Sequence, residues 1–418
     1  MEAKIISAKA REVLDSRGNP TVDCSLGTKK NSVIAIVPSG ASTGAYEACE
    51  MRDADKKRYN GKGVLKAVEN INKKIKPKIL GRSALEQKEL DSLLIELDGT
   101  ENKTNLGANA LLAVSMACCR LAAMEKGIPL FKHLAFLAKN KNLSLPSPQM
   151  NVINSGKHIG LEKGDIQEHM IVPAKFDSFA DSLRAGVETY NCLKNFLKKR
   201  FGAKSTLLGD EGGFSPEIEK IEERLELMCS AIKEAGYEGK IMLGLDSAAT
   251  EFFSGNSYSI QEKEFSPNEL IDFYSALIEK FPIISIEDGF AEDDWSTWIE
   301  FSKECGKKID IIGDDLLTTN IERIKKAIKE KACNSLLLKP NQIGTVTEAI
   351  SAAQLAQKNN WKVVVSHRSG ETEDSFIADL AVGLGAEFSK FGAPARSERT
   401  AKYNQLLRIE EELKNLKK

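Results

Sequence analysis

Hydrophobic and polar residues follow two different patterns along the chain. In its first third, the stretches KIISAKAREVLD (4–15), NPTVDCSLGT (19–28) and NSVIAIVPSG (31–40) are short and bounded by turn residues, which predicts strands. The later stretch LGANALLAVSMACCRLAAMEKG (106–127) has apolar residues at helical spacing and ends at a glycine, which predicts a helix. Strands followed by helices favour an α+β domain over residues 1–133.

From residue 142 onward the pattern changes to short apolar strands that are each followed by an amphipathic helix. Six such strands are predicted, at 240–246, 283–288, 310–315, 334–340, 362–370 and 386–392. A closed barrel of βα units explains this rhythm better than an open sheet, because no dinucleotide fingerprint or phosphate loop favours the open form. The polar, proline-containing segment 138–149 predicts the boundary between the two parts. We therefore expect a barrel domain over residues 142–418.

Composition narrows the class of protein without identifying it. The 418 residues include 59 basic and 60 acidic side chains, mixed along the chain, and the net charge is -1. Neither nucleic acid nor an anionic membrane is therefore an expected partner. The N-terminus becomes charged before a signal-peptide core develops, and we find no apolar run of about 18 residues. We expect a cytoplasmic protein without a membrane span.

Cysteine and histidine usage bears on metal chemistry. The eight cysteines lack the paired spacing of a zinc site or a redox dithiol, so buried, reduced thiols are the expectation. With only four histidines, a metal centre built on imidazole is disfavoured. Any metal should be held by oxygen.

Each predicted strand of the barrel ends in a titratable side chain. These residues are Asp246, Glu287, Asp314, Lys339, His367 and Lys390. Charged residues are rare on fully buried strands but common at their C-terminal ends, where a βα barrel places its active site. The six strand ends therefore predict one shared site.

The three carboxylates among them, Asp246, Glu287 and Asp314, predict a metal site. Like charges raise one another's pKa, so three ionised carboxylates cannot lie together without a cation. Oxygen ligands with room left for water or substrate suit Mg²⁺. The alternative is that Asp246 caps the segment 247–253 and Asp314 the turn 316–320. Each residue alone fits that alternative, whereas the three together favour the metal.

Lys339 and Lys390 would then flank the metal. A lysine ordinarily has a pKa of about 10.4, which burial and nearby cations lower toward the value that a general base needs. We therefore expect a lowered pKa and interpret these lysines as candidates for the base. Alone, each is more simply a solvated strand end.

The motif SHRSGETED (366–374) places His367, Arg368 and Ser369 where a strand turns toward a helix. A guanidinium fork, a hydroxyl and the N–H groups of the turn suit a phosphate or a carboxylate. Arg368 could equally pair with Glu371 or Glu373.

Two candidate acids stand in other loops. Glu211 lies next to two glycines in LLGDEGGF (207–214), and glycine lets a backbone approach a ligand closely. Glu168 in DIQEHM is the second candidate, and an acidic turn without a role is the alternative for Glu211. Two glycine-rich segments, 38–48 and 154–160, are either loops that fold over a pocket or linkers. Their polar residues include Ser39, Ser42, Thr43 and His158.

Nine strings occur in order along the chain: VLDSRGNPTV, PSGASTG, LGANA, GDEGGF, SIED, GDDL, NQIGT, SHRSGETED and GAPARSERTAKYNQLLRIEEEL. Together they resemble the enolase family. The resemblance implies an α/β protein whose modified TIM-type barrel begins ββαα before its βα repeats and follows an N-terminal α+β lid domain. It also implies the glycolytic and gluconeogenic reaction of a phosphopyruvate hydratase, the reversible, Mg²⁺-dependent dehydration of 2-phospho-D-glycerate to phosphoenolpyruvate.

The resemblance implies roles for individual residues as well. Of two Mg²⁺ ions per site, Asp246, Glu287 and Asp314 would bind the first, and Ser42 would help to place the second with the substrate phosphate. Lys339 would be the base at C2 and Glu211 the acid at C3, with Glu168 and His158 as further catalytic residues. The expected substrate contacts are His158, Gln167, Glu168, Lys339, His367, Arg368, Ser369 and Lys390, of which Arg368 and Ser369 would hold the phosphate and Lys390 the carboxylate.

Five positions depart from the usual pattern of that family: Ser155, His169, Gly289, Pro340 and Phe391. None of them removes a catalytic group. Pro340 has the most direct bearing, because it fixes the backbone just after Lys339 and removes an N–H. It could stiffen that lysine or misdirect it.

Other functions stay open at this point. The barrel could act on another carboxylic acid, as dehydratases and racemases of the wider enolase superfamily do, although Ser42, Arg368 and Ser369 suit a phosphate. The terminal Lys417 and Lys418 could add plasminogen binding in a cell-surface or secreted pool, although basic residues at a helix end also complement the helix dipole. The resemblance further implies a homodimer or an octamer.

Overall fold

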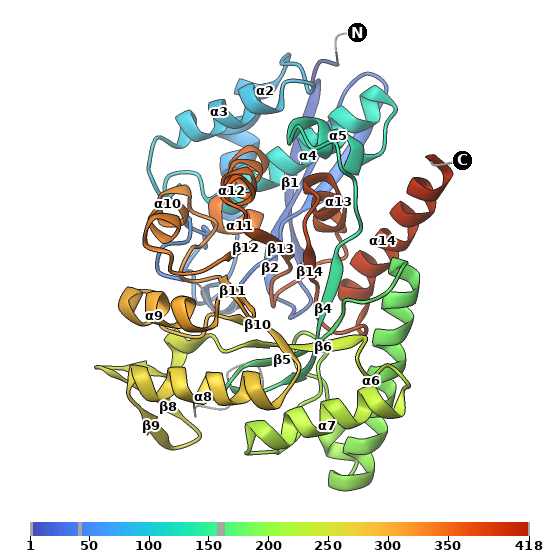
Figure 1. The fold of residues 1–418 in the computed structure, drawn as a ribbon. Coiled ribbons are helices and arrows are strands. Elements are labelled where there is room, and N and C mark those ends of the chain that lie inside the picture. Colours follow the sequence, from blue (N-terminus) through green and yellow to red (C-terminus); the bar gives the residue numbers. More distant parts are fainter. Residues whose placement is uncertain (1–2, 41–43, 157–163, 417–418) are drawn as a thin grey trace.

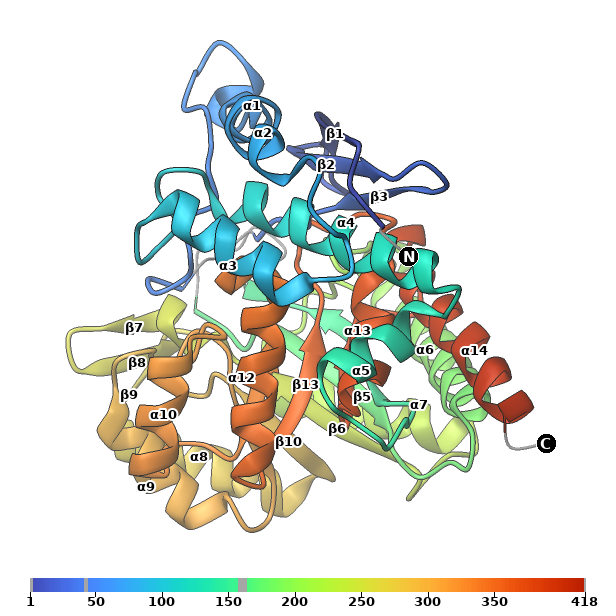
Figure 2. The ribbon, with the colours of Figure 1, turned by 90° about the horizontal axis from the view of Figure 1, so that it is seen from above.

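The N-terminal part of the computed structural model is an antiparallel sheet covered by helices (Figures 1 and 2). Residues 3–40, 44–156 and 164–416 are described. The strands pair in the order β1-β2-β3, and the expected α+β arrangement is confirmed. Its elements are β1 (Ser7–Leu14), β2 (Pro20–Gly27), β3 (Ser32–Ile36), η1 (Tyr59–Gly61), α1 (Leu65–Glu69), η2 (Asn70–Ile75), α2 (Lys76–Ile79), α3 (Gln87–Asp98), α4 (Ala108–Lys126) and α5 (Leu130–Leu137).

Helix α4 is the core element of this part. It ends where Gly127 takes a left-handed conformation with φ 64°, which glycine adopts without strain. By length and composition α4 is the one described helix that could cross a membrane, but 83% of its apolar stretch is buried in the protein. The eight cysteines are all free, and five of them, including Cys118 and Cys119 on this helix, are buried.

The second part is a closed barrel of eight strands (Figure 1). β5 runs antiparallel to both its neighbours, β4 and β6, and two α-helices, joined by one short 3-10 helix, follow β5 before β6. The barrel therefore begins ββαα and continues with βα repeats, as expected. Its strands are β4 (Ser147–Asn154), β5 (Glu168–Pro173), β6 (Ile241–Asp246), β10 (Ile283–Glu287), β11 (Asp310–Gly313), β12 (Ser335–Leu338), β13 (Lys362–Ser366) and β14 (Phe388–Lys390).

Helices and one small sheet surround the barrel. Side-chain caps start several helices, for example Asn320 before α10 and Thr345 before α12. The helices are α6 (Phe179–Phe201), η4 (Ala203–Thr206), α7 (Ile221–Glu234), η5 (Ala249–Phe252), α8 (Pro267–Lys280), α9 (Trp295–Cys305), α10 (Ile321–Glu330), α11 (Pro340–Ile343), α12 (Val346–Lys358), α13 (Phe376–Leu384) and α14 (Ser397–Leu416). The sheet consists of β7 (Phe253–Ser254), β8 (Ser257–Ile260) and β9 (Lys263–Phe265).

Alternation along the strands separates two hydrophobic clusters. One fills the barrel and consists of Val172, Ile312, Leu337, Val364 and Phe388. The flanking residues Leu336 and Leu338 belong instead to the large cluster between strands and helices, because successive side chains on a strand point to opposite faces. Two residues beyond Ile312, Leu337 and Phe388 stand Asp314, Lys339 and Lys390. The same alternation therefore places these charged residues at the mouth of the barrel interior.

The N-terminal part contacts the barrel at the loop between β13 and α13. Ser39 and Gly370 form a two-way backbone bridge, with N–H to carbonyl distances of 2.7 and 2.9 Å. Asp374 of the same loop accepts a bidentate pair of bonds from Arg120 on α4, at 2.6 and 2.5 Å, and one from the N–H of Ile36 on β3. The loop that carries Arg368 is thus held by residues of the N-terminal part.

The Asp374–Arg120 pair predicts a pH-dependent stability. Burial opposes ionisation of Asp374, but Arg120 outweighs it and lowers the pKa of that carboxyl. The stabilisation is therefore present above the unfolded pKa of about 3.9 and lost as the pH falls through the folded value. Asp374→Asn should lower the free energy of unfolding by about 3 kcal/mol at neutral pH. Urea titrations should show this difference shrinking below pH ~4, and a difference that does not change with pH would contradict the assignment.

Candidate active site

One cavity at the C-terminal ends of the barrel strands gathers most of the predicted site residues. It is lined by Gln167, Glu168, Glu211, Asp246, Ala248, Asp288, Asp314, Asp315, Lys339, Ser366, His367, Arg368, Ser369 and Lys390. Glu287 joins this group through its contact with Lys390. Ser42 and His158 lie outside the described residues. The structure therefore brings together every described member of the predicted set.

Lys390 stands among three carboxylates. Glu168, Asp246 and Glu287 are neighbours in register across β5, β6 and β10, and Lys390 reaches them from β14. Its Nζ lies 2.7 Å from Asp246, 2.9 Å from Glu287 and 3.2 Å from Glu168. Burial alone would lower the pKa of Lys390, but these carboxylates outweigh it and hold the pKa well above its ordinary value. Lys390 is therefore a permanent ammonium group in this structure.

Lys339 ends β12 and forms an ion pair with Asp314. The expectation of a lowered pKa for this lysine is wrong for the structure as it stands. Burial does act in the expected direction, but Asp314 outweighs it and raises the pKa of Lys339. In return, Lys339 overcomes the effect of burial on Asp314 and lowers the pKa of that carboxyl. The sequence predicted two flanking lysines but not that each would pair directly with a carboxylate.

The carboxylates still fit a hard divalent cation. Glu287 is fully buried, its Oε2 makes no hydrogen bond within the described residues, and burial together with Asp246 raises its pKa well above the usual range. One oxygen from each of Asp288, Asp314 and Asp315 also lies within 4.8 Å of the others. Crowded, buried oxygen ligands of this kind suit Mg²⁺. The predicted ligand set and this cluster share Asp314.

The capping alternative is correct in part for Asp246. Its Oδ1 accepts a bond of 3.0 Å from the N–H of Ala248, while its Oδ2 pairs with Lys390. The side chain of Asp314 does not cap the turn that follows it. Its two oxygens accept from Gln342 Nε2, at 2.8 Å, and from Lys339.

The partner of Arg368 was not predicted. Its guanidinium forms a bidentate pair with Glu47, at 3.0 and 3.1 Å, and a bond of 3.1 Å to Asn341 Oδ1. Glu371 Oε1 accepts from the backbone N–H of Arg368 at 3.3 Å. Glu47 lies in the glycine-rich segment 38–48 of the N-terminal part, and its distance in sequence gave no signal of this pairing.

The two candidate acids lie together on the other side of the cavity. Glu168 is hydrogen-bonded to Glu211, and burial together with Glu211 raises the pKa of Glu168 well above its usual range. Asn151 Nδ2 donates to Glu211 Oε2 at 3.0 Å, and His367 Nε2 lies 3.3 Å from the same oxygen. Two buried carboxyls in contact cannot both ionise readily, so this pair shares a proton.

None of the five family departures is among the residues that line the cavity. Ser155 Oγ donates to Asp165 at 2.5 Å, and the buried Phe391 packs against Tyr403 with ring centres 6.0 Å apart. His169 is fully buried, and burial together with Arg224 lowers its pKa well below the usual range. Gly289 and these three residues do not line the cavity.

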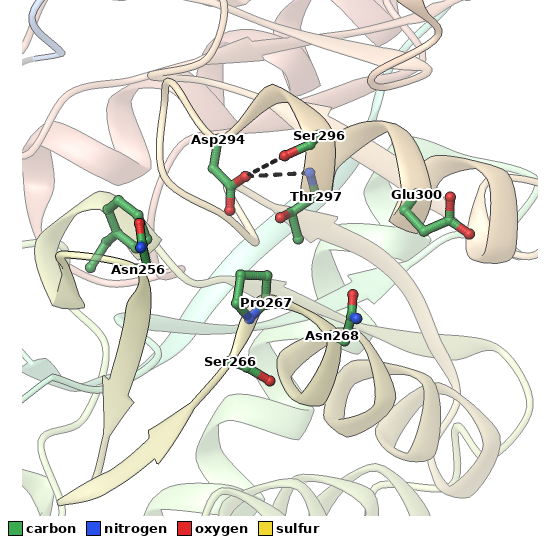
Figure 3. Close-up of a pocket in the computed structure, with 9 residues that line it drawn as sticks. Asn256, Ser266, Pro267, Asn268, Asp294, Ser296, Thr297 and Glu300 are labelled. Carbon is green, nitrogen blue, oxygen red and sulfur yellow. Dashed lines mark hydrogen bonds between the residues drawn. The ribbon is translucent and has the colours of Figure 1, made fainter.

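A second hollow lies between the small sheet and the starts of α8 and α9 (Figure 3). Its acidic residue Asp294 is engaged in capping α9, accepting from Ser296 Oγ at 3.1 Å and from the N–H of Thr297 at 3.4 Å. Ser266 likewise forms a capping box with Glu269 at the start of α8. Asp294 and Ser266 are thus engaged in capping α9 and α8.

A closed βα barrel with buried carboxylates and lysines at its C-terminal mouth defines a barrel enzyme that acts on an anionic substrate. Residues 5–134 match the family model "Enolase, N-terminal domain", and residues 142–418 match "Enolase, C-terminal TIM barrel domain". A curated protein named "Enolase" from Mastigamoeba balamuthi is 54% identical over 421 residues, covering 98% of this chain and 96% of that protein. The chain belongs to the enolase family. Its enzyme class is phosphopyruvate hydratase, a carbon–oxygen lyase of glycolysis, and the family implies dependence on a metal.

The hydrogen bonds around Pro340 bear on whether this proline stiffens or misdirects Lys339. Pro340 is the first residue of α11, where a missing N–H has no intrahelical partner to lose. The backbone N–H of Lys339 donates to Thr319 Oγ1 at 3.0 Å, and the carbonyl of Lys339 accepts from the N–H of Gln342 at 3.0 Å. Lys339 is therefore held on both sides independently of Pro340.

We predict that Pro340→Val changes kcat by less than about twofold and lowers the free energy of unfolding by less than ~1 kcal/mol. Thr319→Val is the contrasting variant, because it removes the hydroxyl that holds the backbone of Lys339. It should reduce kcat by more than Pro340→Val does. Steady-state kinetics and urea unfolding of both variants check this, and a larger loss for Pro340→Val would show that the proline aims the lysine.

Proposed function

We propose that the enzyme catalyses the reversible, Mg²⁺-dependent dehydration of 2-phospho-D-glycerate to phosphoenolpyruvate in the cavity described above. The observation that carries this proposal is the meeting of three functional groups in one cavity: a strand-end lysine, a proton-sharing carboxyl pair and an arginine–serine loop. A base, an acid and a phosphate site are what this reaction requires. We further propose that residues 1–133 form a lid domain and residues 142–418 the catalytic domain.

Lys339 is the proposed base at C2. Its half-buried Nζ lies at the end of β12, where, once it has lost its own proton, it would take one from a substrate bound between it and the acid pair. The C2 proton is only weakly acidic, and its removal places a second negative charge on the substrate carboxylate. The permanent ammonium group of Lys390 stabilises that charge where it develops.

Glu211 is the proposed acid that protonates the leaving hydroxyl at C3. The proton is available because Glu211 and Glu168 share it within their buried pair. Arg368 and Ser369 are the proposed phosphate ligands, and Gln167, His367 and His158 complete the wall and the loop around the substrate. A guanidinium is well suited to this task because its fork matches the geometry of phosphate oxygens.

Asp246, Glu287 and Asp314 would hold the first Mg²⁺, and Ser42 would help to place the second. When bound, Mg²⁺ supplies positive charge that stabilises the doubly charged carboxylate and weakens the hold of Asp314 on the Lys339 proton. In the structure as it stands, Lys339 and Lys390 balance the charge of these carboxylates.

The setting of the reaction is also proposed. We place the enzyme in the cytoplasm as a homodimer or an octamer, with a phosphorylated small molecule as its substrate. An unphosphorylated carboxylic acid is the competing substrate class, and the buried Arg368 disfavours it because such a substrate would leave no phosphate for the guanidinium. Lys417 and Lys418, on which plasminogen binding would depend, lie outside the described residues.

The reaction predicts a direct assay. Phosphoenolpyruvate absorbance should appear when 2-phospho-D-glycerate and Mg²⁺ are added to the protein. Lys339→Ala and Glu211→Gln should each lower kcat by about 10²-fold or more, since each removes a general base or acid. Lys325→Ala, on the exposed face of α10, is the matched control and should retain activity. An inactive wild-type protein, or preference for an unphosphorylated acid, would contradict the proposal.

The metal ligands are tested separately. Chelation should abolish the activity and Mg²⁺ should restore it. Asp246→Asn should raise the Mg²⁺ concentration for half-maximal rate by about tenfold or more, whereas Asp315→Asn, which changes only the second acidic cluster, should raise it less. If Asp315→Asn raises the required Mg²⁺ concentration more than Asp246→Asn does, the metal site would be assigned to Asp288, Asp314 and Asp315 instead.

A further inference from the structure

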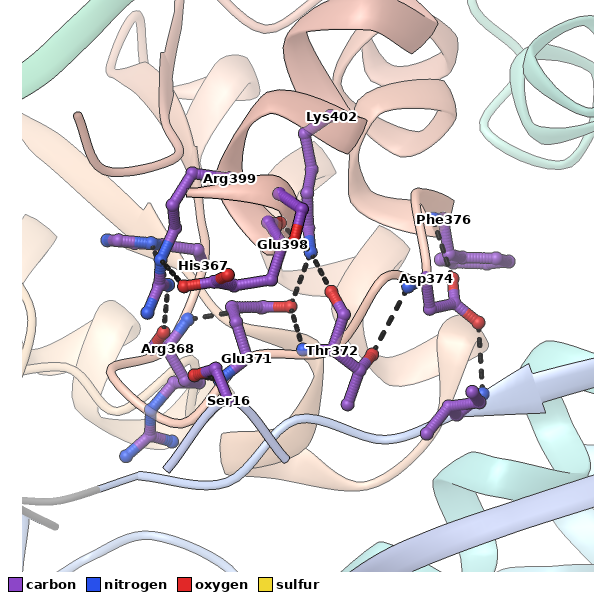
Figure 4. Close-up of polar contacts among 12 residues, drawn as sticks. Ser16, His367, Arg368, Glu371, Thr372, Asp374, Phe376, Glu398, Arg399 and Lys402 are labelled. Atoms are coloured by element: carbon purple, nitrogen blue, oxygen red, sulfur yellow. Dashed lines mark hydrogen bonds and ion pairs between the residues drawn. The ribbon is translucent and has the colours of Figure 1, made fainter. Parts of the chain in front are cut away.

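Helix α14 inserts two fully buried cations beneath the loop 367–372. Arg399 and Lys402 are both 0% exposed, and Figure 4 shows them reaching from the helix toward this loop. Lys402 donates to Glu371 Oε2 at 2.6 Å and to two backbone carbonyls. These partners are all oxygen atoms, so Lys402 acts as a structural cation. Arg399 differs, because one of its partners is a ring nitrogen.

Arg399 fixes the protonation of His367. Its Nη1 lies 2.6 Å from His367 Nδ1. A guanidinium has five N–H donors and no acceptor, so His367 Nδ1 must accept this bond. The neutral imidazole then carries its proton on Nε2. Burial, against the opposing charge of Glu211, lowers the pKa of His367 to about 3, so the ring stays neutral in the working pH range.

The Nε2–H group of His367 points toward Glu211, the proposed acid. His367 Nε2 lies 3.3 Å from Glu211 Oε2, and Asn151 Nδ2 donates to the same oxygen at 3.0 Å. Two N–H donors directed at Oε2 leave Oε1 as the oxygen that carries the acidic proton. Arg399 also holds the backbone beside this residue, since its Nη2 donates to the carbonyl of Asp210 at 3.0 Å.

Close packing around Gly392 holds the His367 ring in this orientation. Gly392 has φ 85°, and a Cβ at that position would lie 3.0 Å from His367 Cε1 and 2.9 Å from Arg399 Cδ. The glycine therefore lets the backbone press directly against both side chains. His367 and Arg399 remain in contact because neither has room to turn away.

We propose that Arg399 is a positioning residue for the acid: it holds His367 as the tautomer protonated on Nε2, and that N–H orients Glu211 so that Oε1 carries the proton. The inference deepens the proposed function and depends on the role of Glu211 given there. Arg399 itself touches no reacting atom.

The tautomer can be measured in the wild-type enzyme with Mg²⁺ bound. The chain has only four histidines, so a long-range ¹H–¹⁵N spectrum of protein labelled in its imidazole rings is simple to interpret. The spectrum of His367→Gln identifies the His367 signals by their loss. We expect an unprotonated Nδ1 and a protonated Nε2 for His367, from about pH 6 to pH 8. A protonated Nδ1 would overturn the inference.

Variants of Arg399 and Lys402 distinguish a role in positioning Glu211 from a role in the stability of the fold. Arg399→Met should lower kcat by about tenfold or more, change KM by less than about threefold, and release the fixed tautomer of His367. Arg399→Lys keeps an N–H donor, so it should recover part of the lost kcat and part of the preference for the tautomer protonated on Nε2. Lys402→Met is the matched control from the same helix with the same burial, and it should lower the unfolding midpoint while leaving the His367 signals unchanged.

The outcomes are distinct. A loss of kcat in Arg399→Met with unchanged His367 signals would show that Arg399 is only structural. If Arg399→Met does not fold, the wild-type spectrum and Arg399→Lys decide. Inactive wild-type protein would contradict the proposed function, whereas active protein with a protonated Nδ1 would contradict this inference alone.

Discussion

The structure depends on the neutralisation of the charged side chains that the barrel strands place at its C-terminal mouth. Strand alternation directs Asp314, Lys339 and Lys390 toward the interior, just beyond the apolar residues that fill it. An isolated buried charge costs several kcal/mol, so these groups must pair or bind an ion. The cavity is stable because lysines balance carboxylates, and the same pairs would be the ones that a substrate and a cation rearrange.

The N-terminal part of the protein holds one loop of this site in place, the loop between β13 and α13. Ser39, just beyond its sheet, bridges to Gly370, its helix α4 binds Asp374, and Glu47 pairs with the guanidinium of Arg368. The loop with the proposed phosphate ligands is therefore supported by residues more than 200 positions away in the sequence. From the other side, Arg399 supports the same loop and His367. A proposed phosphate site held from both directions is pre-organised, which reduces the cost of ordering it on binding.

Much of the fold was predictable because its signals are local. Six of the eight barrel strands are short apolar runs that end at or just before a titratable residue, such as Asp246 or Lys339, which marks the open end. The strand-end residues of the candidate site followed from the same rule, whereas Glu211 came from a glycine-rich loop and Gln167 from the resemblance alone. The pairing among them did not, because the partners of Lys390 and Arg368 come from distant elements. The raised pKa of Lys339 was missed for that reason: burial could be inferred from the leucines before it, but the contact with Asp314 could not.

The most direct test of this account is the exchange of protons when Mg²⁺ binds. Calorimetric titration of Mg²⁺ into the protein at neutral pH, in buffers of different ionisation enthalpy, counts the protons released. Glu287 and Asp288 have pKa values raised well above the usual range by burial and by neighbouring carboxylates, so a bound cation should ionise them. The account predicts a net release of protons that is reduced in Glu287→Gln. Binding without proton release would contradict a cation site built on these buried carboxylates.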